Sequence, residues 1–472
     1  MIREIASKDL LTSRRESLLI VLSAVCVALL VAGTFIGMQR DAEFARERTA
    51  AELVDRSVWL NQGERNPHSA AHFSRYAFRS SSPLALLDPG VGDYAGIALW
   101  MEAHFQNPAE FRRAEDSGEL ARSVPLSPAT LFLVALPLLV FVAMYASIAG
   151  EREDGTLRQL TASGMRGRAF FLGKLLGGLR LVLPVFLVLY VAIAAMALAT
   201  ASAPIEPDTI ARAASLLALY ALYLVACVAI ALGVSALFRT RQAALLALIC
   251  VWALMTVLAP RLATDLGRSL YPSPDARVVT AQLEAAARAY STDPDGQEAV
   301  RQSALDEYGV STVEDLPIAY NAYVLQKAEE ASFPEFERVF GSIAERHAEQ
   351  NNVARALTLL SPLVPATNLS RGFAGTDLAH QNHFANAAEA HRRAMIRMLN
   401  EDYMYNSGAA GSAYTAGREV WEQFEDFSYR PLTLGQAWRL YLTDAILLLV
   451  WAVAAVSAAY VLVRRAIHGE GA

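Results

Sequence analysis

The sequence is poor in cysteine and in charged residues. Only three cysteines occur among its 472 residues, and 19% of the residues are charged. Cys26, Cys227 and Cys250 all lie inside apolar runs without a disulfide or metal-ligand spacing, which argues against a disulfide framework and a cysteine metal site. The 41 Lys and Arg residues do not exceed the 47 Asp and Glu residues. With no basic excess to neutralise a phosphate backbone, we expect no nucleic-acid partner.

Long apolar segments are what the sequence has in abundance. Hydrophobic residues make up 54% of the chain, and the mean hydropathy is +0.28. A helix needs about 20 mostly apolar residues to cross the roughly 30 Å hydrocarbon core of a bilayer. We therefore predict an all-α integral membrane protein. Its six transmembrane helices are expected at residues 17–38, 128–149, 181–200, 213–238, 243–261 and 441–463.

Lys and Arg residues mark the ends of these spans on alternate sides. They precede the first span, fill the loop 150–180, separate the fourth and fifth spans, and follow the sixth span. An excess of basic residues in short loops is typical of the cytoplasmic side. The pattern predicts that both terminal segments, 1–16 and 464–472, are cytoplasmic.

Two large insertions, 39–127 and 262–439, are expected on the opposite, extracytoplasmic side. They contain no cysteine, so they must be held by hydrophobic cores. The second insertion has amphipathic helical patterns, among them 276–290 and 379–405, which predict a helical domain. The first is less regular, with turn signals such as Leu87-Asp-Pro-Gly90. Both are predicted to be mainly helical.

Two cytoplasmic segments have amphipathic patterns. In 1–16, the apolar Ile5 and the basic Lys8 and Arg14 predict a helix on the membrane surface. In 150–180, the acidic residues before Thr156 favour a helix N-terminus, and Leu157 and Leu160 form one apolar edge. Such an edge suits docking into the groove of a partner, although a solvated connector has the same composition.

The stretch Glu151-Arg-Glu-Asp-Gly-Thr-Leu-Arg-Gln-Leu160, followed by Phe171-Leu-Gly-Lys-Leu175, resembles the cytoplasmic loop of the ABC-2 superfamily of transporter permeases. Residues 5–14 resemble the membrane-surface helix of the same superfamily. Extracytoplasmic stretches such as Pro67-His-Ser-Ala-Ala-His-Phe73 resemble its long-insert branch, a family named only as a domain of unknown function. The resemblance implies a coupling helix that contacts a separate ATPase subunit. The implied coupling residues are Glu151, Glu153, Asp154, Gly155, Thr156, Leu157 and Leu160.

The resemblance further implies a permease subunit that is not itself an enzyme and has no cofactor, because the partner binds ATP. The stretch from Gly167 to Leu175 lacks the spacing and the hydroxyl of a phosphate-binding loop. We expect a homodimer, or a heterodimer with a sister permease, surrounded by lipid in the bacterial inner membrane. It would export a hydrophobic or amphipathic substrate or move its extracytoplasmic domain. An alternative is a mechanical relay for a periplasmic partner in metalloprotein maturation.

Two histidine pairs raise a different function. His68 with His72, and His380 with His383, are spaced so that each pair can share a helix face and bind one metal ion. Neither pair has the glutamate of a His-Glu-x-x-His hydrolase, and isolated histidine pairs are usually solvated or hydrogen-bonded. A membrane-anchored metal-binding protein or metalloenzyme therefore stays a weaker alternative.

Overall fold

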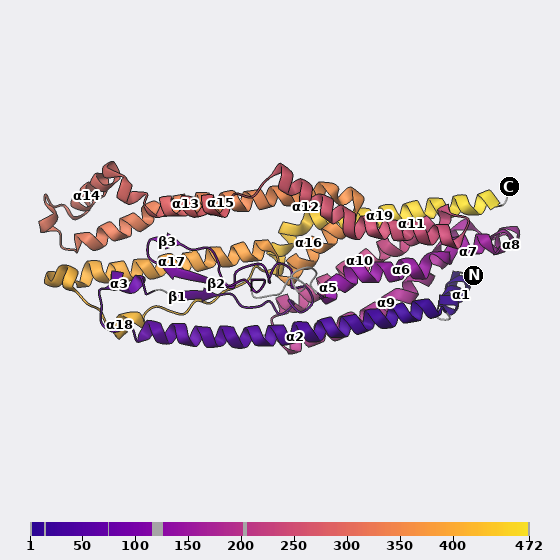
Figure 1. Cartoon of the computed structure of the whole chain (residues 1–472), viewed down its shortest axis with the longest axis horizontal. Helices are drawn as coiled ribbons and strands as arrows, with labels where there is room; N and C mark the ends of the chain where they lie inside the picture. The colour runs from indigo at the N-terminus through magenta and orange to yellow at the C-terminus, as the bar shows by residue number, and fades with distance from the viewer. Residues whose placement is uncertain (1, 14–15, 74, 116–125, 202–204, 471–472) are drawn as a thin grey trace.

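The computed structural model describes residues 2–13, 16–73, 75–115, 126–201 and 205–470, and it is strongly elongated (Figure 1). The first helix, α1 (Ile2–Ser13), lies at one end together with α7 (Ala146–Glu153) and α8 (Thr156–Ala162). The C-terminal part of α19 (Leu434–Glu470) reaches the same end. The large insertions occupy the other end, so the elements predicted to be cytoplasmic are gathered opposite the predicted extracytoplasmic ones.

The described residues contain six helices that are long and apolar enough to cross a membrane, as predicted. They are Ser17–Leu60, Pro128–Glu153, Gly167–Ala199, Pro207–Leu237, Arg241–Leu270 and Leu434–Gly469. The first, third, fourth and sixth correspond to α2, α9, α10 and α19. The second comprises α5 (Pro128–Thr130), α6 (Leu136–Met144) and α7, and the fifth comprises α11 (Arg241–Ala253) and α12 (Ala259–Leu270). The prediction of an all-α membrane protein with six spans is confirmed.

Two of the spans contain a π-helical turn, and each turn is followed by a proline. The turns are Leu131–Ala135 and Leu254–Leu258. A proline has no N–H to donate, so Pro137 leaves the Leu133 carbonyl without its usual helical donor. The Tyr223 hydroxyl on α10 donates to that carbonyl at 3.0 Å. Such replacement donors are what make a proline tolerable inside a membrane.

The helix α10 is the centre of the membrane bundle. Its most apolar window is 61% buried, compared with 22% for α2 (Ser17–Leu60). It packs against α19, α9 (Gly167–Ala199) and α6. On α10, Leu216, Tyr220 and Leu224 are all buried. The much lower burial of α2 leaves most of its apolar surface uncovered by the rest of the chain.

The first insertion begins inside a helix, because α2 does not end near Met38 but continues to Leu60. It is followed by α3 (Pro67–Ala71) and by a small antiparallel sheet in the order β1-β2-β3. The strands are β1 (Arg75–Phe78), β2 (Ala98–Glu102) and β3 (Phe105–Gln106). In the register, Tyr76 pairs with Trp100 and Glu102 pairs with Phe105. The sequence predicted a mainly helical insertion with turns here, and it did not predict this sheet.

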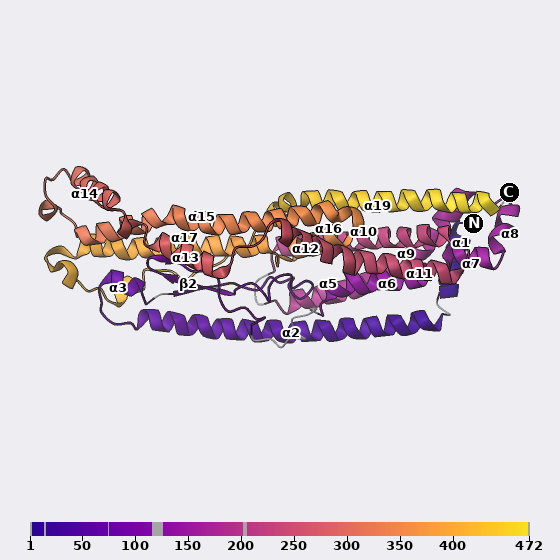
Figure 2. The ribbon, with the colours of Figure 1, turned by 45° about the horizontal axis from the view of Figure 1, so that its top comes forward.

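The second insertion is helical, with two long helices lying side by side (Figures 1 and 2). These are α15 (Tyr320–Ala356) and α17 (Leu378–Asn406), joined by α16 (Leu363–Ala374). The shorter helices are α13 (Ala276–Ala287), α14 (Pro294–Tyr308) and α18 (Arg418–Trp421). Trp59 at the end of α2 lies in the core that this insertion shares with the sheet, and its Nε1 donates to the Trp421 carbonyl at 2.8 Å. The end of α2 is therefore fixed to the extracytoplasmic domain.

Buried polar contacts join the extracytoplasmic helices to the membrane bundle. Asp444 on α19 is fully buried and accepts from the Arg355 guanidinium at 2.8 and 3.0 Å. The Asn368 side chain donates to the same carboxylate at 2.8 Å. On the opposite face of α16, the Ser370 hydroxyl lies 2.6 Å from the Tyr220 hydroxyl. Because a buried charge must be paired, these contacts hold α15 and α16 against the spans.

Candidate functional site

The candidate coupling element is the helical hairpin formed by α7 and α8. Gly155 joins the two helices with a left-handed backbone (φ +71°), and Gly164 follows α8 with φ +79°. An L-residue costs about 1–2 kcal/mol in this conformation, which explains the glycine between the acidic residues and Thr156. The two glycines therefore set where α8 begins and where the chain leaves it.

Glu151, at the end of α7, is the centre of a buried ion network. Its carboxylate accepts from the Lys174 ammonium at 3.1 Å and from Lys8 at 2.8 Å, and it also accepts from the Thr156 hydroxyl. Lys174 in turn donates to Asp9 on α1 at 2.8 Å. Lys174 and Glu151 are only 2% and 8% exposed. The network therefore joins α1, α7, α8 and α9 from the inside.

Small residues let α1 lie directly on α9. A Cβ added at Gly173 would come within 2.8 Å of the Ile5 Cβ, and one at Gly177 within 3.2 Å of the Asp9 Cβ. This approach buries Asp9, and burial raises the pKa of its carboxyl while the nearby Lys174 ammonium opposes the rise. The Gly-Lys pair of the loop motif thus has a structural explanation: the glycine admits α1, and the lysine binds its acidic side chain.

The predicted coupling residues divide into an inner and an outer set. Leu157 is 1% exposed and belongs to the hydrophobic core of the helix bundle, and Leu160 packs against the same core. Both leucines therefore contact the chain itself, whereas the sequence suggested an apolar edge for a partner. Glu153, Asp154 and Gly155 are exposed. Of the predicted interface-helix residues, Ile5 and Lys8 lie on α1, and Arg14 lies outside the described residues.

Two side chains that the sequence analysis did not assign to the hairpin also hold it in place. Arg241, at the start of α11, forms a two-point ion pair with Asp154, at 3.0 and 2.5 Å, and its backbone N–H donates to Glu153. Ser235 on α10 accepts from the backbone N–H groups of residues 148 and 149, each at 3.1 Å. From the sequence, the basic residues between the fourth and fifth spans indicate only the cytoplasmic side. The partners of Arg241 depend on the fold, because they lie more than 80 residues away along the chain.

The structure brings His68 and His72 together and adds a third histidine, His104. The ring centroids of the three imidazoles lie 4.9–5.3 Å apart. Burial and the two neighbouring imidazoles lower the pKa of His68 to about 4. Among the described residues, these three histidines form a group of potential ligands that lie close enough together to hold one metal ion.

In the second predicted pair, His380 and His383 each have their own hydrogen-bond partner. The His380 ring contacts the Asp377 carboxylate through Nδ1 at 2.7 Å, and the Tyr441 hydroxyl donates to the other oxygen of that carboxylate. His383 contacts the Tyr429 hydroxyl through Nδ1 at 3.2 Å. These side chains form hydrogen bonds that join α17 to the start of α19 and to the segment before it.

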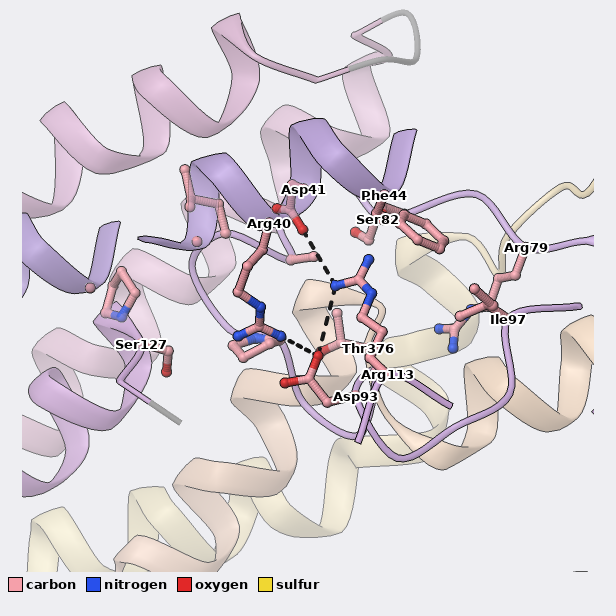
Figure 3. A pocket seen from close by; sticks show the side chains of 18 of the residues that line it. Arg40, Asp41, Phe44, Arg79, Ser82, Asp93, Ile97, Arg113, Ser127 and Thr376 are labelled. Atoms are coloured by element: carbon pink, nitrogen blue, oxygen red, sulfur yellow. Dashed lines mark hydrogen bonds and ion pairs between the residues drawn. The ribbon is translucent and has the colours of Figure 1, made fainter. Parts of the chain in front are cut away.

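A polar cavity of about 70 Å³ lies where α2 meets the loops of the first insertion (Figure 3). Arg40 on α2 forms an ion pair with Asp93, and the Arg113 guanidinium lies 3.7 Å from Asp93 and 3.9 Å from Asp41. The opposite charges are paired with one another within the cavity. Together they tie the middle of α2 to the loops around residues 93 and 113.

These features define a multi-pass α-helical membrane protein with a polar hairpin at one end and a helical domain at the other. Residues 110–263 match the family described as ABC-2 family transporter protein. Residues 278–430 match the family described as a domain of unknown function, DUF3526. No curated protein matches the sequence. The chain thus contains an ABC-2 family transporter domain followed by a DUF3526 domain, in agreement with the resemblance of its loop, and the ABC-2 domain supports a general role as a transport permease.

Proposed function

We propose that the chain is the transmembrane permease subunit of an ATP-binding cassette transporter of the ABC-2 type. A separate ATPase subunit binds and hydrolyses ATP, and the outer surface of the α7–α8 hairpin is its contact. The observation that carries this proposal is the position of the hairpin. It lies at the end of the molecule, fixed from the inside by Glu151, and presents the exposed side chains of Glu153, Asp154, Arg158 and Gln159.

The ion network couples movement of the hairpin to movement of the rest of the molecule. Movement of α8 displaces Glu151, which holds Lys8 directly and Asp9 through Lys174, so α1 must follow. The next helix along the chain is α2, a continuous helix of 44 residues with a length of about 66 Å at 1.5 Å per residue. Because its far end is fixed to the extracytoplasmic core through Trp59, α2 can transmit a displacement across the membrane.

An apolar cavity of about 210 Å³ favours a hydrophobic or amphipathic substrate. It lies between α2, α6 and α9 and is lined by residues such as Leu30, Phe132 and Val185. One wall of this cavity is α2, whose most apolar window is only 22% buried. The length of α2 supports the second candidate, a mechanical relay that moves the extracytoplasmic domain, including one acting on a periplasmic partner in metalloprotein maturation.

The functional unit in this proposal is a dimer in the bacterial inner membrane. Exposed apolar side chains on α2, α9, α11 and α19, among them Val31, Val188, Leu246 and Val453, are available for lipid and for a second permease, either a copy of the chain or a sister subunit. The hairpin end is cytoplasmic, in line with the positions of its basic residues. The chain itself binds no cofactor in this scheme.

Co-purification with a candidate ABC ATPase subunit produced in the same cells tests the proposal. Arg158→Glu reverses an exposed charge on α8 without touching the buried network, so we expect it to reduce ATPase binding and substrate-stimulated ATP hydrolysis. Arg239→Glu makes the same charge change on the neighbouring exposed loop and is the matched control. Equal binding by both variants and the wild type would contradict the assignment of the hairpin as the contact.

A further inference from the structure

Three histidines far from the hairpin form a cluster that the transport role does not use. His68 lies on α3, His72 is the residue that ends this helix, and His104 lies in the turn between β2 and β3. Their ligand nitrogens all lie within 4.8 Å of one another. The Nε2 atoms of His68 and His104 are only 3.2 Å apart.

Local structure explains why the three rings meet. Asn66 begins α3, with its side chain accepting from the His68 backbone N–H at 3.0 Å, and Pro67 occupies the first turn. Residues 68 and 72 are one helical turn apart and lie on the same face. His104 has a left-handed backbone (φ 64°) in the tight β2–β3 turn, a conformation that non-glycine residues seldom adopt. That turn places its ring against His68.

The outer partners of two rings determine where their protons lie. His104 Nδ1 is 2.9 Å from Glu329 Oε1, and a carboxylate paired with Arg392 at 3.2 Å can only accept. His68 Nδ1 is 3.3 Å from Asn400 Oδ1, whose amide nitrogen donates to Gln326. Both rings therefore carry their proton on Nδ1.

This assignment leaves a lone pair on each Nε2 atom, and the two lone pairs face each other across 3.2 Å. When both rings are neutral, no hydrogen is left to bridge them. A tetrahedral Zn²⁺ ion binds histidine nitrogen at about 2.0–2.1 Å, which places two ligand nitrogens about 3.3–3.4 Å apart. The observed separation thus matches the spacing that one shared metal ion requires. His72 supplies the third ligand atom, which lies within 4.8 Å of those of the other two histidines.

We propose that His68, His72 and His104 bind one divalent transition-metal ion of the Zn²⁺ type, with a fourth coordination position open to solvent. Glu329 and Asn400 orient two of the ligands, as carboxylates and amides commonly do behind metal-binding histidines. The site joins α3 and the sheet to α15 and α17, and it is independent of the ATPase contact.

The test is titration of the purified full-length protein, stripped with a chelator, with Zn²⁺ in a calorimeter. We expect one ion per chain. The variant His68→Ala/His104→Ala should lose at least about 100-fold in affinity, and Glu329→Gln about 10- to 100-fold, because outer partners set ligand orientation. His347→Ala, which removes a histidine on α15 outside the cluster, should bind like the wild type.

Two further measurements separate loss of ligands from loss of fold. Circular dichroism and thermal unfolding of each variant without metal show whether the domain still folds. Co²⁺ bound to the wild type should give the strong visible absorption of a tetrahedral site, and the double variant should not. The proposal is overturned if folded wild-type protein binds Zn²⁺ no more tightly than the folded double variant, or if His347→Ala loses as much.

Discussion

Lys174→Met is the sharpest test of the buried network behind the hairpin. The ammonium of Lys174 is 2% exposed and donates to both Glu151 and Asp9, which are 8% and 16% exposed. Methionine keeps the length of the side chain but removes the charge, so two largely buried carboxylates lose their shared cation. Breaking a buried ion pair by removing one partner costs about 3–5 kcal/mol. We expect a loss of stability in that range.

Lys8→Met is the matched control, because Lys8 donates to the same carboxylate of Glu151 but is 59% exposed. An ion pair on the surface contributes about 0–1 kcal/mol, so this variant should unfold almost like the wild type. Equilibrium unfolding in mixed detergent micelles, followed by circular dichroism, measures both. The reasoning is refuted if Lys174→Met is no less stable than Lys8→Met.

Three other predictions concern the hairpin, the extracytoplasmic core and the orientation of the chain. Gly155→Val should weaken ATPase binding, because valine disfavours the left-handed backbone, whereas Gly155→Asn should be tolerated better; co-purification compares them. Arg392→Met removes the fully buried guanidinium that pairs with both Glu329 and Glu389, and should lower the free energy of unfolding by about 3–5 kcal/mol in a denaturant titration. In a cysteine-free background, an impermeant maleimide applied to intact cells should label Ser303→Cys but not Ser163→Cys. The reverse result would show that the chain has the opposite orientation in the membrane.

Much of the architecture could be predicted from local sequence. The six spans follow from apolar runs long enough to cross a bilayer. The continuation of α2 to Leu60 could also have been found, because residues 39–60 are rich in Ala, Glu and Arg, which favour helices. The small sheet could not, because its strands have only four, five and two residues and depend on pairing between distant segments.

At the candidate sites too, the sequence identified individual residues and motifs, but not the contacts between residues that are distant in the sequence. The sequence identified Glu151 and the Gly-Lys pair as parts of a motif, but their direct contact joins residues 23 positions apart. It identified Leu157 by its spacing, and only the packing of α8 shows that this side chain faces the chain's own core. His104 was missed because its approach to His68 depends on the β2–β3 turn.

Site-specific photo-crosslinking tests the central claim of an ATPase contact at the hairpin most directly. A photoreactive residue replaces Gln159, which is exposed on α8, and in a second sample Gln302, which is exposed on α14 at the opposite end of the molecule. When the two subunits are produced together in cells, the account predicts a crosslink to the ATPase from position 159 and none from position 302. A purified complex that gives no crosslink from position 159, or an equal yield from both positions, would contradict it.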